Sequence, residues 1–282
     1  MAAVLGTNTA SIWASKNLQS AQTDMAKSVE RLSSGLRINR ASDDAAGLGI
    51  ANALTQQING ANQGVRNLND GISMVQTAEG AINAASEMAQ RILTLATQGT
   101  NGSMGTDQKS AIQNEMKQLL ASMSAIQTRT KFSGSSLLGA SADVTIAASN
   151  VASDTVTIDK DVSLRAIYAS TGTGAAKELY DAVYATVASG TFDTIVTKSN
   201  AFITALDTQR SKLGALQNQM DYSISNVTEM SANLTAARSR VQDTDYASET
   251  ASLTKGQILQ QAATAMLAQA NQMPNVILSL LK

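Results

Sequence analysis

Residues 51–96 read ANALTQQINGANQGVRNLNDGISMVQTAEGAINAASEMAQRILTLA, and this stretch decides the fold. Apolar residues recur along it at alternating three- and four-residue steps, interrupted only by Glu79 and Ser86. Such a repeat is typical of a long helix that packs along another helix. At 1.5 Å per residue the helix would extend about 70 Å and present its side to partners, which favours assembly over a ligand pocket. The seam comprises Ala51, Leu54, Ile58, Ala61, Val65, Leu68, Ile72, Val75, Ile82, Ala89, Leu93 and Ala96.

A second seam lies near the other end of the chain, where apolar residues stand seven apart at Leu213, Met220, Val227, Leu234 and Val241. It is the only comparable seam, so we expect the two to pair. Between them, period-two stretches at 144–146 and 155–158 predict a small hairpin. The predicted fold is therefore mainly α: an antiparallel long-helix coiled-coil bundle formed by the N- and C-terminal regions, with a small β-containing central lobe.

The boundaries follow from turn and cap signals. A first helix is expected over 9–33 and ends at Gly35, and Ser42 is expected to cap the long helix, with Asp43 and Asp44 in its first turn. This divides the chain into three parts. They are terminal helices (1–42 plus 243–282), a long-helix rod (43–138 plus 192–242) and a short surface lobe (139–191).

The amino-acid composition narrows the range of functions that the chain can have. The chain is 43% hydrophobic but only 3% aromatic, its net charge is −1, and it has neither His nor Cys. The balanced charge argues against nucleic acid as a partner. Missing Cys excludes disulfides and thiolate metal sites, and missing His removes the commonest general base and metal ligand. The start of the chain does not resemble a cleavable signal peptide, and the longest apolar run is too short to cross a membrane.

The C-terminal segment 255–282 carries ten large apolar residues, which surround the expected helix rather than forming one stripe. Burying them within a single chain would not offset the entropy lost by ordering the segment. We therefore expect both terminal segments to be disordered in the free monomer and to fold on assembly.

Three separated stretches carry a family resemblance. RLSSGLRINRASDDAAGLGIA (31–51) closely resembles the N-terminal signature of bacterial flagellins. LGALQNQ (213–219) resembles the flagellin return helix, and ANQMPNVILSLL (270–281) resembles the flagellin C-terminus. Because they occur in the family's order and the resemblance covers 1–138 and 192–282, the match is specific.

The resemblance implies a structural subunit of the extracellular flagellar filament, exported unfolded through the type III channel without a cleavable signal. The implied partners are further copies of the chain, an export chaperone, the filament cap and hook-associated proteins. No catalytic residue, cofactor, metal or membrane span is expected. The closest alternative is a hook–filament junction protein. A cytoplasmic coiled-coil adaptor and an enzyme are more distant alternatives.

The resemblance also implies assembly residues. In the segment before the long helix, the residues alone allow either an ion network between subunits or a solvated turn with a capped helix start, and the family favours subunit contact. Near the C-terminus, Pro274 either introduces a tolerated kink or shapes subunit packing. The expected assembly residues are Arg31, Arg37, Asn39, Arg40, Asp43, Asp44, Asn271, Pro274, Ile277, Leu280 and Leu281.

One further stretch, residues 90–98, resembles the flagellin segment recognised by vertebrate toll-like receptor 5. The residues that match the receptor-contact pattern are Gln90, Arg91, Leu95 and Glu115. Leu93 and Thr94 depart from it, because the usual pattern has a basic and then an acidic residue there. Apart from the receptor, these residues are expected to pack against the return helix.

Overall fold

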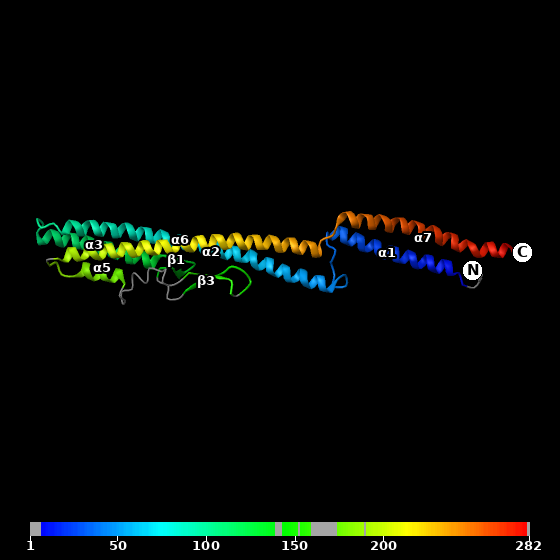
Figure 1. The fold of residues 1–282 in the computed structure, drawn as a ribbon, viewed down its shortest axis with the longest axis horizontal. Helices are drawn as coiled ribbons and strands as arrows, with labels where there is room; N and C mark the ends of the chain where they lie inside the picture. The colour runs from blue at the N-terminus through cyan, green and yellow to red at the C-terminus, as the bar shows by residue number, and fades with distance from the viewer. Residues whose placement is uncertain (1–6, 139–142, 152, 159–173, 189, 281–282) are drawn as a thin grey trace. The chain divides into compact units, whose positions relative to one another are not determined.

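The computed structural model describes residues 7–138, 143–151, 153–158, 174–188 and 190–280, and for 135 and 273–280 it describes the backbone only. It is mainly helical, as predicted (Figure 1). The helices are α1 (Thr9–Ser34), α2 (Ala45–Gly99), α3 (Thr106–Arg129), α5 (Ala175–Tyr184), α6 (Thr191–Gln242) and α7 (Tyr246–Leu280). The strands are β1 (Lys131–Phe132), β2 (Ser135–Ser136), β3 (Val144–Ala147) and β4 (Thr155–Ile158).

The chain forms two compact units. The terminal unit comprises Met1–Gln56 and Asn233–Lys282, and the central unit comprises Gln57–Ala232. The predicted boundaries lie at 42/43 and 242/243, so the terminal unit includes the start of α2 and the end of α6 as well.

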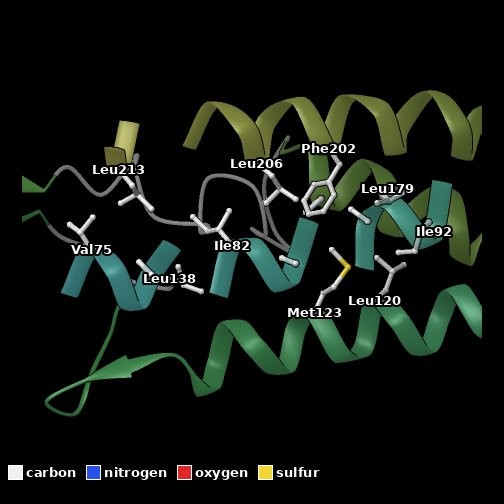
Figure 2. Packing of buried hydrophobic residues seen from close by; sticks show 14 of the residues in the cluster. Val75, Ile82, Ile92, Leu120, Met123, Leu138, Leu179, Phe202, Leu206 and Leu213 are labelled. Atoms are coloured by element: carbon white, nitrogen blue, oxygen red, sulfur yellow. The ribbon is translucent and has the colours of Figure 1, made fainter. Parts of the chain in front are cut away.

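In the central unit, α2 and α6 run antiparallel. The Ser231 hydroxyl donates to the Asn62 side-chain oxygen at 3.2 Å, Gly71 faces Met220, and Gly99 faces the ring of Phe192. Residue numbers thus rise along α2 as they fall along α6. Figure 2 shows the resulting core, in which Phe202 and Leu206 of α6 point towards α2, while Met123 and Leu120 of α3 approach from the other side.

The buried seam of α2 differs in detail from the predicted one. Leu68, Val75 and Ile82 are buried as expected, but Ala78 and Ala85 complete the seam. Ile92, rather than the predicted Leu93, is buried at the next step. Of the other predicted seam positions, Ile58, Leu213, Met220 and Val227 are buried, whereas Leu54, Val65, Ile72, Leu234 and Val241 are half-buried.

The predicted hairpin is present as the antiparallel pair β3 and β4, with Ile146 opposite Val156. It docks on a glycine face of α2. Gly60 faces Asn150, Gly64 faces the Ala148 carbonyl, and Gly71 faces Ile146. A side chain at Gly64 would overlap the hairpin backbone, so only glycine allows this close approach. The Asn67 amide, on the same side of α2, donates to the Ala147 carbonyl at 3.1 Å and fixes the docked position.

Helix α5 packs on α3 and also contributes to the core of the central unit. It ends at Tyr184. Its buried residues Ala176, Leu179 and Val183 belong to the same apolar cluster as Ile146 and Val156 of the hairpin. The described parts of 139–191 are therefore built into the core rather than attached to it.

In the terminal unit, α1 and α7 lie side by side (Figure 1). Asn8 caps α1, accepting from the Ser11 backbone N–H at 3.1 Å, and Gly35 ends the helix in the left-handed conformation (φ 73°), as predicted. Among the side chains of α1 and α7 that the structure describes, the buried ones are all small: Ala21, Ser28, Gly256 and Ala270. No described helix is both long enough and apolar enough to cross a membrane.

Candidate assembly surfaces

The segment between α1 and α2, residues 35–44, is called the linker segment here. Backbone hydrogen bonds join it to the connection between α6 and α7. The Arg37 N–H donates to the Gln242 carbonyl at 2.6 Å, and the Thr244 N–H donates to the Gly35 carbonyl at 2.9 Å. The Arg37 guanidinium donates to the Val241 carbonyl, also at 2.6 Å. The linker segment and the connection between α6 and α7 are thus held together by hydrogen bonds within one chain.

The arginines at the linker segment pair with glutamates that the sequence analysis did not single out. Arg40 Nη2 lies 2.9 Å from Glu30 Oε1, which also accepts from the Asn39 amide at 3.0 Å. Arg31 Nη1 lies 3.5 Å from Glu249 Oε2, joining α1 to α7. Glu30 could have been predicted from the sequence, because it directly precedes Arg31 in the same charged stretch. Glu249 was not identifiable, because it lies more than two hundred residues away in sequence.

Asp43 and Asp44 accept hydrogen bonds from backbone N–H groups rather than forming ion pairs. Asp43 accepts the N–H groups of Arg40 at 2.9 Å and Asn39 at 3.1 Å, and these hydrogen bonds hold the pKa of its carboxyl below the ordinary value. Asp44 accepts from the Gly47 N–H at 2.8 Å, and α2 begins at the next residue. The expectation that Ser42 caps this helix is therefore wrong. Asp44 is the cap, because its side chain reaches a free N–H of the first turn.

The outer surface of α1 and α7 is unusually apolar for a helix pair. Trp13 is 63% exposed, with the Lys16 ammonium 5.3 Å from its ring centroid. A groove of about 610 Å³ runs beside it between the two helices, and Leu259 and Met266 line the groove. Among the described side chains of the pair, the exposed large hydrophobic ones are Ile12, Trp13, Val29, Tyr246, Ile258, Leu259 and Met266. Burying the exposed half of such a side chain contributes about 1 kcal/mol, so this surface favours further burial.

The predicted C-terminal assembly residues are only partly described. Asn271 is exposed and accepts a hydrogen bond from the Ser11 hydroxyl at 3.1 Å, and next to it Asn8 donates to the Ala270 carbonyl at 2.7 Å. These two contacts join the start of α1 to the C-terminal half of α7. The backbone of α7 continues as helix through Pro274, Ile277 and Leu280, whose side chains are not described. Leu281 lies outside the described residues.

The residues expected to contact the receptor divide into an exposed group and a buried one. Gln90, Arg91 and Glu115 are exposed, and Arg91 joins α2 to α3 through a 2.7 Å contact between its Nη2 and Glu115 Oε1. Leu95 is only 2% exposed and lies in the core of the central unit. Leu95 falls on the face of α2 that packs inwards, so it does not share the exposed surface of the other three residues.

Comparison with known proteins identifies the family. Residues 5–143 match the bacterial flagellin N-terminal helical region, and residues 196–281 match the bacterial flagellin C-terminal helical region. The chain belongs to the bacterial flagellin family. It is 36% identical to flagellin of Bacillus subtilis over 303 residues, covering 98% of each chain. It is 34% identical to flagellin B of Vibrio cholerae over 375 residues, covering all of both chains.

A solved structure resembles the fold at much lower identity. The structure of a putative flagellar hook-associated protein from Vibrio parahaemolyticus has a TM-score of 0.60 with 13% identity, covering 71% of this chain and 100% of that one. At this identity the likeness concerns the fold alone. Flagellins are structural proteins that self-associate into extracellular filaments, so the family accounts for an arrangement of surfaces rather than a catalytic centre.

Proposed function

We propose that the chain is the subunit of a bacterial flagellar filament and that copies assemble through the apolar outer surface of α1 and α7. One observation carries this proposal. Only small described residues of the two helices are fully buried, larger ones such as Met25 and Leu267 are half-buried, and Trp13 and Met266 are exposed. A two-helix pair of this kind is marginal by itself, because burial of small side chains contributes little against the entropy of ordering. Neighbouring copies would supply the missing burial.

The same surface supports coupled folding and assembly. We propose that the terminal segments are disordered before assembly and order when neighbouring subunits cover them. A chain without Cys can form no disulfide that would obstruct passage in an extended state, which suits export without a cleavable signal peptide. The proposed partners in this sequence of events are an export chaperone, the filament cap and hook-associated proteins, in addition to further copies of the chain.

A hook–filament junction protein is the second candidate, and the fold likeness to the hook-associated protein does not separate the two. The full-length similarity to flagellins favours the filament subunit. Abundance separates the two. A filament subunit is the dominant protein in sheared filaments, whereas a junction protein is a minor band.

For the linker segment we propose a contact between subunits in addition to its bonds within the chain, because Arg40 and Asn39 keep exposed outer faces. For the immune receptor we propose a contact limited to Gln90, Arg91 and Glu115. Arg91→Ala should then weaken binding of the toll-like receptor 5 ectodomain to the monomer. Unchanged binding would exclude this group.

Seeded polymerisation tests the main proposal. Trp13 is the only tryptophan of the chain, so its fluorescence reports directly on the proposed surface. Adding sonicated filament seeds to purified monomer should give filaments in negative-stain microscopy, together with a blue shift of tryptophan emission as Trp13 leaves water. Met266→Ser should slow elongation, and the matched control Val151→Ser, an exposed apolar residue of the central unit, should not. Filaments whose Trp13 emission stays that of an exposed ring would exclude this surface as the interface.

A further inference from the structure

Two tyrosines form a stacked pair on α5. Tyr180 and Tyr184 stand one helical turn apart, their ring centroids are 4.1 Å apart, and the ring planes differ by 21°. Both are accessible, with 47% and 44% of their surfaces exposed. The neighbouring Tyr180 hydroxyl, together with burial, raises the pKa of Tyr184. Because the rings are stacked, ring carbons of the two phenols are also neighbours.

The backbone beneath this pair is firmly anchored. Leu179 and Val183, on the adjoining face of α5, are fully buried in the core. The Gln113 amide of α3 donates to the Val183 carbonyl at 2.8 Å and to the Ala185 carbonyl at 2.6 Å, which satisfies acceptors at the open end of the helix. The Lys117 ammonium lies 5.3 Å from the centroid of the Tyr184 ring. The rings are thus held in proximity by both packing and hydrogen bonds.

We propose that Tyr180 and Tyr184 are a site of oxidative modification, at which an oxidant that removes single electrons from phenols joins the two rings in an intrachain dityrosine. Each phenol loses one electron and its hydroxyl proton to give a phenoxyl radical. The two radicals form one carbon–carbon bond between the ring carbons next to the oxygens. Each of these carbons then loses its hydrogen as a proton while the proton on oxygen is restored. The net change is the loss of two protons and two electrons, which one hydrogen peroxide takes up through a peroxidase to give two waters.

Proximity makes this pair selective. A partner held on the same short segment has an effective concentration of about 1 mM or more, compared with about 10 µM for a partner on another molecule in dilute solution, so the pair should react roughly 100-fold faster. Tyr222 and Tyr246 are more exposed, and neither belongs to an aromatic pair in the described part of the chain. Exposure alone would favour Tyr222, which is 78% exposed. Geometry and exposure therefore predict different products.

The cross-link would act as a staple across the last turn of α5. It would prevent this turn from unwinding, because the bond joins residues whose separation depends on helical geometry. The modification requires no assembly, so it does not depend on the proposed filament function and can be tested on the monomer.

Tryptic mapping reads out the product directly. Cleavage after Lys177 and Lys198 places Tyr180 and Tyr184 together on peptide 178–198, while Tyr168, Tyr222 and Tyr246 fall on three other peptides. The monomer would be treated with horseradish peroxidase and a small excess of hydrogen peroxide. We expect peptide 178–198 to lose the mass of two hydrogens and to gain dityrosine fluorescence, at roughly 100 times the yield of any peptide pair containing Tyr222 or Tyr246.

Three controls make the outcome decisive. Tyr180→Phe and Tyr184→Phe should each abolish the product, and Tyr222→Phe should leave its yield unchanged. Oxidation in concentrated guanidinium chloride should reduce the yield by about tenfold or more, because unfolding removes the stacked geometry but not the sequence spacing. Equal yields from folded and unfolded protein, or a dominant cross-link through Tyr222, would overturn the proposal.

Discussion

Replacing Gly64 by alanine tests whether the hairpin is seated on α2 as described. The added Cβ would lie 1.7 Å from the Ala148 carbonyl oxygen, whereas ordinary contact begins at 3.4 Å. The hairpin must therefore retreat by roughly 1.7 Å. This displacement breaks the 3.1 Å bond from Asn67 to the Ala147 carbonyl, at a loss of about 0.5–1.5 kcal/mol.

The retreat also partly uncovers Ile146 and Val156, the buried side chains of the hairpin, and this loss of burial costs about 1–2 kcal/mol. The substitution also stabilises the helix by about 0.5–1 kcal/mol, because alanine is a better helix former than glycine. The net expectation is a destabilisation of about 0.5–3 kcal/mol.

Gly80→Ala is the matched control, because Gly80 lies on the same helix and no atom lies within 4 Å of the place that the alanine methyl group would take. It should stabilise the protein by about 0.5–1 kcal/mol, so the two substitutions should have opposite signs. The assay is the urea midpoint of unfolding, together with hydrogen exchange of the amides in 144–158, which should quicken only in Gly64→Ala. If both variants are stabilised equally, the hairpin does not rest on this glycine.

Three further outcomes are expected. Leu68→Asp places an unpaired charge in the core, so it should destabilise the central unit by about 4 kcal/mol and block filament formation. The control Asn69→Asp, at an exposed neighbouring residue, should alter stability by less than about 0.5 kcal/mol. Urea unfolding measures the stability of both variants. The pKa of Asp43 is depressed, so its contribution to the linker segment is present at neutral pH and is lost as pH falls below 3.8 through the lower folded value. Amide exchange across this window should show it, and Asp43→Asn should remove the pH dependence. Gln113→Ala leaves the carbonyls at the end of α5 without a donor and should cost about 2 kcal/mol, with faster amide exchange confined to α5 and its contacts.

The helical architecture was accessible from the sequence, because a 3.5-residue repeat leaves few other structures open. The exact seam was less accessible. Ala78 and Ala85 are too weakly hydrophobic to stand out, and adjacent apolar residues such as Ile92 and Leu93 cannot be separated by periodicity. The hairpin strands were predicted from their period of two, but nothing in that pattern indicated their seat on α2.

At the assembly surfaces, too, some residues could be predicted from local sequence and others could not. The conspicuous charges near Arg31 and Arg40 were found from local sequence, and their partners Glu30 and Glu249 were not. Similarity to a receptor-binding pattern selected Leu95 by residue type, yet the direction of a side chain depends on helix packing. Local patterns therefore identify which segments are special, while tertiary contacts decide which atoms meet.

The alternation of alanine with larger residues along the α2 seam has a consequence for mutational tolerance. Ala85 and Ala89 are fully buried, so the packed helices approach closely at these steps. Shortening a neighbour such as Ile82 leaves a void into which the surroundings can partly relax, whereas enlarging Ala89 demands that two backbones separate. Gains in side-chain volume at the smallest positions of this seam are thus a separate class of deleterious change, which truncation scanning alone would miss.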